Sequence, residues 1–296
     1  MKALVTGGTG LVGRYIVEEL LAAGYEVVVA GRTPPASGLF SAPVGFFEFT
    51  LDAAGDYDAP VEGAAFLIHA AFDHVPGRYR GGEGDDPAAF RRRNLDGSVR
   101  LFETARRAGL RRAVFLSSRA VYDGIPAGVA LTEDTDLAPS SLYGEVKLGC
   151  EKALAALSDP DYCAASLRLT GVYGDLHPNK WDGLIGDYLA GRPVPVRAGS
   201  EVHGRDVGRA VRLMLEADAA EVGGAVFNVS DLIADTHDIL SIVSDARGCP
   251  HPLPARADTA AVAAMECGKI RALGWEPGGE TLFVETVRRL AGPCRD

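Results

Sequence analysis

The glycine-rich turn near the start of the chain constrains its fold more than any other feature. Residues 3–5 are apolar and typical of a buried strand, residues 6–13 have the sequence TGGTGLVG, and apolar residues from 11 to 21 recur at helical spacing. A turn without side chains lets backbone N–H groups approach a pyrophosphate at the helix N-terminus. We therefore expect a dinucleotide-binding βαβ unit. Its cofactor contacts would include Gly7, Gly10, Leu11, Val12 and Gly13.

Short apolar runs continue to alternate with longer helical segments along the first part of the chain. Strands separated by helices pair in parallel, with helices on both faces, because crossover connections are almost always right-handed. The sequence therefore predicts the α/β class, with a Rossmann-type doubly wound parallel sheet. The expected strands are residues 3–5, 26–30, 46–51, 65–70, 113–117 and 164–169.

The pattern changes after about residue 170, where prolines divide the chain into shorter elements. Helices are expected at residues 205–216, 235–246 and 281–290. Doubly wound sheets bind ligands beyond the carboxyl ends of their strands, so a smaller lobe would cover the crevice there. We expect residues 1–170 to form an NAD(P)-binding Rossmann domain to which residues 201–230 return, and residues 171–200 and 231–296 to form a smaller C-terminal α/β substrate-binding lobe.

Charge and cysteine usage exclude several classes of function. The chain has 30 lysines and arginines against 40 aspartates and glutamates, and its formal net charge of −10 repels nucleic acid and anionic lipid. Its five cysteines show no CxxC spacing, so we expect neither a metal site nor a disulfide framework. We find no apolar run of membrane-spanning length and no signal peptide, so we expect a cytoplasmic location and no membrane partner.

The end of the second expected strand bears on the choice of cofactor. A cofactor without a 2′-phosphate is normally held there by an acidic residue on its ribose, but this chain has Gly31 and Arg32 instead. Glycine leaves room, and a guanidinium suits a phosphate better than a free hydroxyl. The sequence therefore favours NADP over NAD, while an exposed arginine without a cofactor role stays open as the alternative.

A second group of residues has the spacing of an acid–base site. Tyr143 and Lys147 are four residues apart and share one face of an expected helix, and Ser118 ends an upstream strand. A nearby ammonium favours the phenolate of a tyrosine, whose pKa is ordinarily about 10. The phenol can then exchange a proton at neutral pH.

These motifs resemble those of the extended short-chain dehydrogenases/reductases, the NAD-dependent epimerase/dehydratase family, nearly from end to end of the chain. The glycine turn is similar to the family's TGxxGxxG, residues 69–71 (HAA) to its strand-four signature, residues 94–97 to its NxxG helix and residues 168–174 (RLTGVYG) to its later motif. The resemblance implies a catalytic triad of Ser118, Tyr143 and Lys147. It also implies cofactor contacts by Asp52, Ala70, Asn94, Tyr143 and Lys147.

Two positions depart from the family's nucleotide-sugar epimerases. Those enzymes carry Asn where Thr170 stands, and a diphosphate-binding arginine four residues before the position of His203, where this chain has Gly199. Arg197 and Arg205 are the candidate replacements. A buried diphosphate without a paired cation is costly, so we expect a compact substrate, such as a free sugar or sugar acid.

Four residues are candidate substrate contacts. The loop of residues 72–86 is long and overhangs the expected crevice, as lids often do, so it contributes His74 and Arg78. Arg119 directly follows the catalytic serine, where family dehydratases carry an Asp-Glu pair for proton transfer, so we do not expect water elimination. Tyr173 is the candidate from the second lobe.

The sequence favours an NAD(P)-dependent oxidoreductase that transfers hydride to or from a hydroxyl or carbonyl carbon of a sugar-like or other small polar substrate. The first alternative is a nucleotide-sugar epimerase with tightly bound NAD. The second is a non-catalytic NAD(P)-sensing protein, which is disfavoured because such relatives usually lack Tyr143 or Lys147. The resemblance also implies a homodimer, in which the helix starting near Pro87 and the helix of Tyr143 pack against their copies.

Overall fold

The computed structural model describes residues 1–74, 84–177 and 179–292. Its larger part is a seven-stranded sheet in the order β3-β2-β1-β4-β5-β6-β9, with neighbouring strands parallel. The expected Rossmann-type doubly wound sheet is confirmed, although the edge strand β3 ends at Glu48 instead of residue 51. The strands are β1 (Lys2–Thr6), β2 (Glu26–Gly31), β3 (Gly45–Glu48), β4 (Phe66–His69), β5 (Arg112–Ser118), β6 (Cys163–Leu169) and β9 (Val226–Val229).

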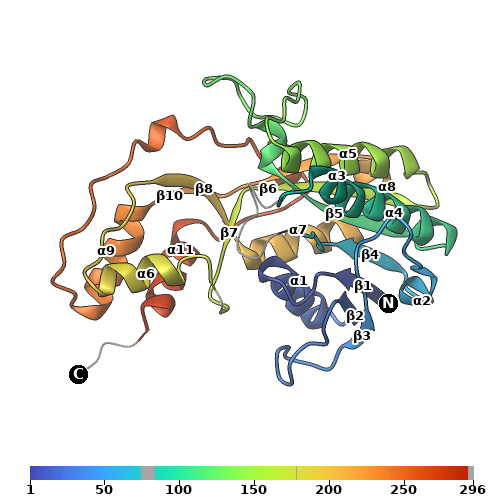
Figure 1. The fold of residues 1–296 in the computed structure, drawn as a ribbon, viewed down its shortest axis with the longest axis horizontal. Coiled ribbons are helices and arrows are strands. Elements are labelled where there is room, and N and C mark those ends of the chain that lie inside the picture. The colour runs from blue at the N-terminus through green and yellow to red at the C-terminus, as the bar shows by residue number, and fades with distance from the viewer. Residues whose placement is uncertain (75–83, 178, 293–296) are drawn as a thin grey trace.

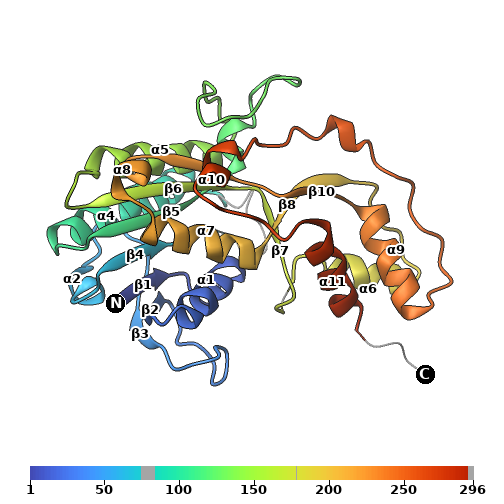
Figure 2. The same cartoon turned by 180° about the vertical axis from the view of Figure 1, so that it is seen from behind.

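Helices cover both faces of this sheet (Figures 1 and 2). On one face α1 and α7 pack together, and Ile16 and Val211 join the strand side chains in one apolar core. On the other face α4 and α5 cover a second core that includes Phe102 and Val146. Burial from both sides explains why the strands are apolar nearly throughout. The helices are α1 (Leu11–Ala22), α2 (Asp58–Val61), α3 (Pro87–Arg91), a π-helix (Arg92–Asp96), α4 (Gly97–Arg107), a 3-10 helix (Arg119–Tyr122), α5 (Leu142–Leu157), α7 (Gly204–Glu216), α8 (Ala219–Val222) and α10 (Gly268–Ala272).

The strand order places a ligand-binding edge beyond the carboxyl ends of β1 and β4. β1 lies between β2 and β4, with Thr6 paired to Ala30 on one side and to His69 on the other. From β1 the chain first adds β2 and β3 on one side and then β4, β5 and β6 on the other. Doubly wound sheets bind ligands at the point where the strand order reverses in this way. β5 ends at the same edge, with Ser118 in register with Leu169 of β6.

A second, three-stranded sheet in the order β10-β8-β7 follows the carboxyl end of β6 (Figure 1). Tyr173 and Ala234 of this sheet pack with α6, α9 and α11 in a separate apolar core. The helices expected at residues 205–216, 235–246 and 281–290 are present as α7, α9 and α11, but the strands were missed because they are short and partly polar. The elements of this part are β7 (Gly171–Tyr173), α6 (Asp182–Leu189), β8 (Ala198–His203), β10 (Leu232–Asp235), α9 (Thr236–Arg247), a 3-10 helix (Thr259–Ala261) and α11 (Gly279–Ala291).

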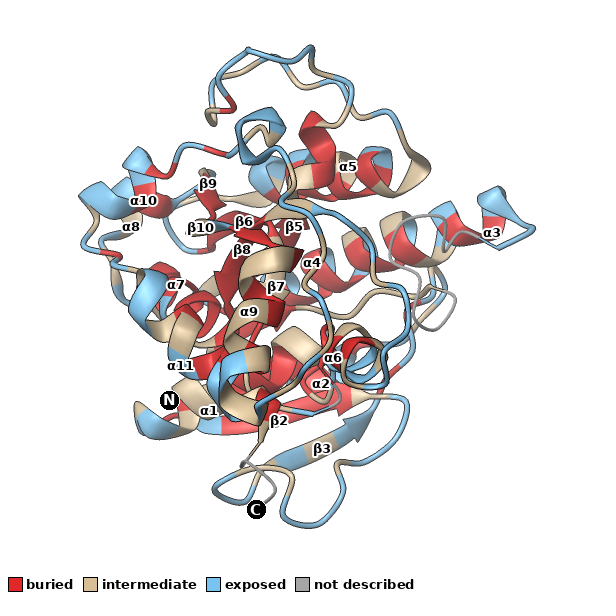
Figure 3. Cartoon of the chain, turned by 90° about the vertical axis from the view of Figure 1, so that its left-hand side faces the viewer, coloured by how far each residue is buried: buried red, intermediate tan, exposed pale blue. Residues whose placement is uncertain are grey.

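Burial is concentrated in the central strands and in the helix faces that flank them (Figure 3). The edge strand β3 is mostly exposed, and its Phe47 is among the exposed large apolar residues. Within the described ranges, no helix is long and apolar enough to cross a membrane. The same ranges contain no group of three or more His, Cys, Asp or Glu side chains placed to hold a metal ion.

Candidate active site

The turn between β1 and α1 is shaped by close backbone contacts that only glycine permits. Gly7 has a φ of 70°, and a Cβ atom there would lie 2.7 Å from Ala71 N. A Cβ atom at Gly13 would lie 2.1 Å from Gly7 O, so the first turn of α1 rests directly on the loop. The N-cap residue is Gly10, which has no side chain to bond the first N–H groups of the helix. The helix N-terminus therefore keeps backbone donors for a cofactor pyrophosphate.

The loop after β4 is held against this turn by a buried histidine. Ala70 N donates to Thr6 O at 3.1 Å. The His69 ring nitrogens lie 2.7 Å from Thr6 Oγ1 and 2.8 Å from Ser98 Oγ. Burial lowers the pKa of His69 to about 3, with a further contribution from the charge of Lys147, so the ring is neutral at neutral pH. His69 thus ties β1, β4 and α4 together, and Ala70 lies at the ligand-binding edge.

Asn94 is fully buried in the π-helix and organises the same loop. Its Oδ1 accepts from Asp73 N at 2.7 Å, and its Nδ2 donates to Asp73 O at 2.8 Å and to Phe90 O at 3.1 Å. Short π-helical segments often occur at functional sites. Here the amide fixes the backbone of Asp73, while the direct cofactor contact of Asn94 stays a prediction.

Asp73 is a candidate cofactor-site residue that the sequence reasoning missed. The Arg32 side chain is 73% exposed, and its Nη1 lies 3.9 Å from Asp73 Oδ1. Arg93 Nε donates to the other carboxylate oxygen of Asp73 at 2.5 Å. The acid absent directly after β2 is thus supplied beside Arg32 by the loop after β4, so short-range sequence inspection could not find it.

Asp52 lies at a hollow of about 370 Å³ in the loop after β3, lined by residues 48–50, 52 and 54–57. Its carboxylate accepts from Ala54 N at 2.8 Å. A Cβ atom at Gly97, the first residue of α4, would lie 2.9 Å from Asp52 N, so this loop packs tightly on the helix. The cofactor contact of Asp52 stays a prediction.

Close packing of α5 on the segment after β5 brings the predicted catalytic elements together. Ser118 ends β5, and its Oγ accepts from Ala120 N at 3.2 Å. Ser141 caps α5 by accepting from Gly144 N at 3.2 Å. A Cβ atom at Gly144 would lie 2.6 Å from Ala120 O. The first turn of α5, which carries Tyr143, therefore lies directly on the segment that follows Ser118.

Lys147 is buried one turn further along α5. Its Nζ lies 5.8 Å from the centroid of the Tyr143 ring and donates to Leu116 O at 2.7 Å. The ammonium also lies over the rings of Phe72 and Phe115, at 4.4 and 4.8 Å. Burial lowers the pKa of Lys147 to about 8, although two neighbouring groups on α5 oppose the shift. The cation remains close enough to favour the phenolate form of Tyr143.

Two of the predicted substrate contacts are engaged within the protein. Arg119 donates to Ala263 O from Nε at 3.2 Å and from Nη2 at 3.0 Å, and to Asp123 Oδ1 at 3.1 Å. Tyr173 is fully buried, with its ring stacked on Trp181 at 5.0 Å. These contacts give both side chains a packing role, and their contact with substrate stays a prediction.

The loop expected to overhang the crevice is described only up to residue 74. The His74 ring stacks at 6.5 Å on Phe72, which in turn meets the Tyr143 ring edge-on at 5.1 Å. His74 is therefore connected to the candidate catalytic phenol through one aromatic ring. Arg78 lies outside the described residues, and both predicted substrate contacts stay predictions.

The second lobe holds an ion pair with a buried carboxylate that the sequence reasoning did not single out. Lys180 Nζ contacts the carboxylate of Glu201, whose side chain is 5% exposed. Burial lowers the pKa of Lys180 and raises the pKa of Glu201. A Cβ atom at Gly199 would lie 3.8 Å from Glu201 Oε1 and 3.9 Å from Arg197 Nη2. A guanidinium therefore lies beside the position where the resembled epimerases carry their diphosphate-binding arginine.

Thr170, the other position that departs from the epimerase pattern, and Arg205, the other candidate replacement, both contact neighbouring elements. Thr170 Oγ1 lies 2.5 Å from both Ser200 O and Ser200 Oγ. Arg205 pairs with Asp175 at 2.6 Å, and Arg289 pairs with the same carboxylate at 2.8 Å. Arg205 is thus committed to a link between α7 and the segment after β7. Of the two candidate replacements, Arg197 is the one placed beside Gly199.

Proteins of known activity resemble this chain over most of its length. It is 30% identical over 300 residues to a UDP-glucose 4-epimerase of Mycolicibacterium smegmatis (strain ATCC 700084 / mc(2)155), with 94% of each chain covered. It is 32% identical over 206 residues to a UDP-glucose 4-epimerase of Bacillus subtilis (strain 168), across 65% of this chain and 58% of that protein. The chain thus spans less than two thirds of the Bacillus relative.

The fold and a family model agree with these likenesses. MoeE5 in complex with UDP-glucuronic acid and NAD superimposes with a TM-score of 0.80 at 26% identity, over 98% of both chains. The model described as the NAD dependent epimerase/dehydratase family matches residues 3–230. The glycine cradle, the Ser-Tyr-Lys elements and this match lead to one conclusion: the chain belongs to the NAD dependent epimerase/dehydratase family.

Proposed function

We propose that the chain is a nucleotide-sugar epimerase that uses NAD, in preference to the oxidoreductase of compact sugars that its sequence favoured. The observation that carries this proposal is the placement of Arg197 beside Gly199, with Lys180 across the Glu201 carboxylate. The compact substrate was expected because a diphosphate would lack a paired cation. Two cations at this place in the second lobe remove that reason.

The cofactor cradle fits a dinucleotide. Cβ atoms at Gly7 or Gly13 would overlap neighbouring backbone, which is the close approach that a pyrophosphate at a helix N-terminus needs. The residues proposed to hold the cofactor are Gly7, Gly10, Leu11, Val12, Gly13, Arg32, Asp52, Ala70, Asn94, Tyr143 and Lys147. When bound, NAD would supply the hydride acceptor and then the hydride donor.

The proton chemistry falls to three side chains. Tyr143 would take the proton of the substrate hydroxyl as the carbon is oxidised, and return it when the carbonyl is reduced from the opposite face. Ser118 would donate a hydrogen bond to the same oxygen and fix its position. Lys147 would favour the phenolate and hold the nicotinamide ribose.

The substrate would be held by the second lobe. The unit proposed for this task is residues 171–200 and 231–296, with residues 201–230 belonging to the larger domain; β8 (Ala198–His203) runs across that boundary. Arg197 and Lys180 would bind the diphosphate, which leaves the sugar directed to the end of β5.

We further propose a homodimer through the helix pair containing α3 and α5, a state that light scattering at micromolar concentration tests.

The test of this function is the fate of cofactor and sugar together. Protein purified without added cofactor should release NAD on denaturation. It should also interconvert UDP-glucose and UDP-galactose, followed by proton NMR of the anomeric signals, without net change in absorbance at 340 nm. UDP-glucuronic acid is the second substrate to assay. Release of no nicotinamide cofactor and no interconversion of any nucleotide sugar would contradict the proposal.

A second candidate function has its own support. Thr170 and Gly199 both depart from the epimerase pattern, which favours a net oxidoreductase of the same family. Such an enzyme would change the absorbance at 340 nm in proportion to the substrate consumed. A substrate-dependent change with a free sugar or sugar acid, and none with nucleotide sugars, would replace the epimerase by this candidate.

A further inference from the structure

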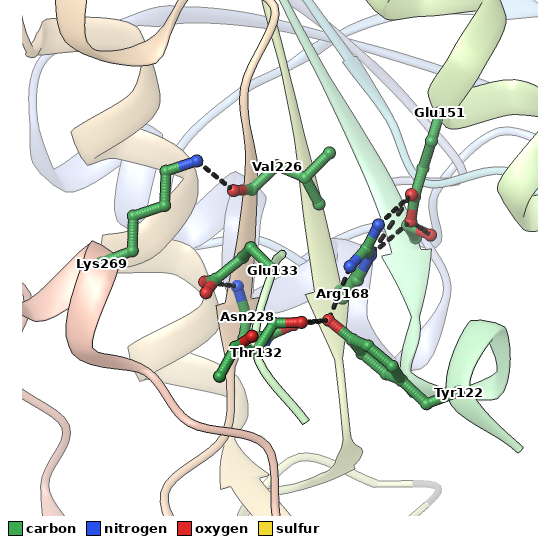
Figure 4. Close-up of polar contacts among 9 residues, drawn as sticks. Tyr122, Thr132, Glu133, Glu151, Arg168, Val226, Asn228 and Lys269 are labelled. Atoms are coloured by element: carbon green, nitrogen blue, oxygen red, sulfur yellow. Dashed lines mark hydrogen bonds and ion pairs between the residues drawn. The ribbon is translucent and has the colours of Figure 1, made fainter. Parts of the chain in front are cut away.

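Glu151 and Arg168 form an ion pair inside the larger domain. Their side chains are 3% and 4% exposed. Arg168 Nη2 donates to Glu151 Oε2 at 2.8 Å, and Arg168 Nε lies 3.1 and 3.2 Å from the two carboxylate oxygens. Figure 4 shows the guanidinium of β6 directed at the carboxylate of α5. None of the chemistry proposed above uses either group.

The Glu151 carboxylate touches both elements that carry the catalytic groups. It accepts the hydroxyl hydrogen of Ser117, the residue before Ser118 on β5. It also lies four residues after Lys147, on the same face of α5. One buried carboxylate therefore fixes the spacing between the strand of Ser118 and the helix of Tyr143.

Arg168 continues the network to the segment that joins these two elements. Its Nη1 donates to the Tyr122 hydroxyl at 2.6 Å, and that oxygen lies 2.8 Å from Thr132 O and 2.9 Å from Asn228 Oδ1 (Figure 4). Asn228 Nδ2 in turn donates to Leu131 O at 3.0 Å. The loop between Ser118 and Tyr143 is thus anchored to β6 and β9.

The energetics of buried ion pairs argue that stability is not what this one provides. Replacing a buried pair by apolar residues of similar volume is often neutral or stabilising, because the charges no longer lose their hydration. We propose that Glu151 and Arg168 are positioning residues, which hold Tyr143 and Lys147 of α5 at the working distance from Ser118. The inference rests on the proposed catalytic roles of those three residues.

Glu151 has a second effect on the same site, through its charge. The titratable groups that face Lys147 are Tyr143, Cys150 and Glu151 from α5 and His69 from β4, with Arg168 behind Glu151 on β6. His69 is neutral, and burial raises the pKa of Cys150 to about 11, so its thiol is protonated at neutral pH. The Glu151 carboxylate raises the pKa of Lys147 against the effect of burial. Removing that charge will let Lys147 lose its proton at a lower pH.

Two kinds of variant separate positioning from stability. The double variant Glu151→Leu/Arg168→Met removes both charges of the pair together, so neither partner is left buried without the other. We expect its unfolding temperature to stay near wild type, its kcat to fall about 10- to 100-fold, and its KM to change little, because misplacement of about 1 Å costs that much in rate. Arg106→Ala, which removes an exposed ion pair with Asp159, is the control with unchanged kcat.

The charge variant is Glu151→Gln, which keeps the shape of the side chain. The chain has five lysines, so the Lys147 signal can be assigned in protein carrying carbon-13 at the lysine Cε. We expect its pKa to fall by about one unit, and the alkaline limb of the kcat profile to move to lower pH by the same amount. The NMR titration needs no substrate, so it still reports on this inference if wild type turns over no nucleotide sugar and the proposed function fails.

Each outcome decides the inference. A folded double variant with kcat within twofold of wild type, or with a raised KM alone, overturns it. If the double variant does not fold, Glu151→Gln decides: loss of kcat with a lowered Lys147 pKa supports the inference, and wild-type kcat or an unshifted pKa overturns it.

Discussion

The two sides of the proposed site, a cofactor wall around the turn between β1 and α1 and a substrate wall in the second lobe, are built from different groups. The cofactor wall is backbone: Gly7 and Gly13 bring main-chain atoms so close that a methyl group has no room. The substrate wall in the second lobe is made of charged side chains, with Lys180 paired to the buried Glu201 carboxylate and Arg197 beside them. Backbone geometry is set by short motifs, whereas a charged cluster depends on the meeting of distant elements. The first wall suits an invariant ligand, and the second can be changed residue by residue to select a substrate.

Tyr143→Phe tests the comparison with the largest expected effect. The variant loses the exchangeable proton, and positioned proton transfer contributes roughly 10²- to 10⁴-fold in rate, so kcat should fall by that factor. Cofactor binding should stay near wild type, because the backbone cradle is untouched. Steady-state kinetics and calorimetric titration with NAD measure the two effects. A variant that keeps more than about a tenth of the wild-type rate would rule out Tyr143 as the acid–base group.

Gly13→Ala breaks the backbone wall itself. Its Cβ atom would lie 2.1 Å from Gly7 O, so the turn must move. We expect the free energy of unfolding to fall by about 1–3 kcal/mol, as for other overpacked sites, and NAD affinity to fall about tenfold or more. Gly186→Ala in α6 is the control, since a Cβ atom there meets nothing within 4 Å and alanine favours a helix. Equal NAD affinity in Gly13→Ala and wild type would refute the backbone cradle.

The same contrast between local backbone motifs and distant charged side chains explains which parts of the site could be predicted from the sequence. The turn at residues 6–13 and the spacing of Tyr143 and Lys147 were found because each is local, set by one turn or one helix face. Asp73 was missed because it approaches Arg32 from the loop after β4, about 40 residues further along the chain. The Lys180–Glu201 pair was missed because its strand, β8, is partly polar and was not recognised.

The burial and packing of individual polar side chains could not be predicted from the sequence either. Tyr173 is the substrate contact predicted from the second lobe; the fold places its ring in the aromatic core there and leaves its hydroxyl without a hydrogen-bond partner among the described residues. Arg119 was chosen for its place after Ser118, but it is held by Ala263 O from the far end of the chain. Sequence position indicates which residues are near a site, and only packing shows which of them keep a free polar end.

Arg197→Ala sharpens the comparison on the substrate wall. If this guanidinium binds the diphosphate, its loss removes one charge-assisted interaction, worth about 1.5–3 kcal/mol, so KM for a UDP-sugar should rise roughly 10-fold or more. The residue is exposed, so the unfolding temperature and NAD affinity should not change. Arg192→Ala, another exposed arginine, which pairs with Asp187, is the matched control. An unchanged KM for every nucleotide sugar turned over would move the diphosphate away from Arg197.

The smallest expected effect concerns two side chains of the cofactor wall, Arg32 and Asp73. Arg32 alone favours NADP, but the Asp73 carboxylate lies 3.9 Å away and would repel a 2′-phosphate bound by that arginine. Because Arg32 is 73% exposed, its pair with Asp73 is weak and its contribution to binding is screened. We expect wild type to bind NAD at least as tightly as NADP. Asp73→Asn should improve NADP binding by about fivefold, and Arg32→Ala in that background should remove the gain. Dissociation constants for both cofactors in wild type, Asp73→Asn, Arg32→Ala and the double variant measure this cycle. If wild type already binds NADP more tightly than NAD, and Asp73→Asn does not change this, Arg32 acts without Asp73. The residues directly after β2 would then be enough to predict the cofactor from the sequence.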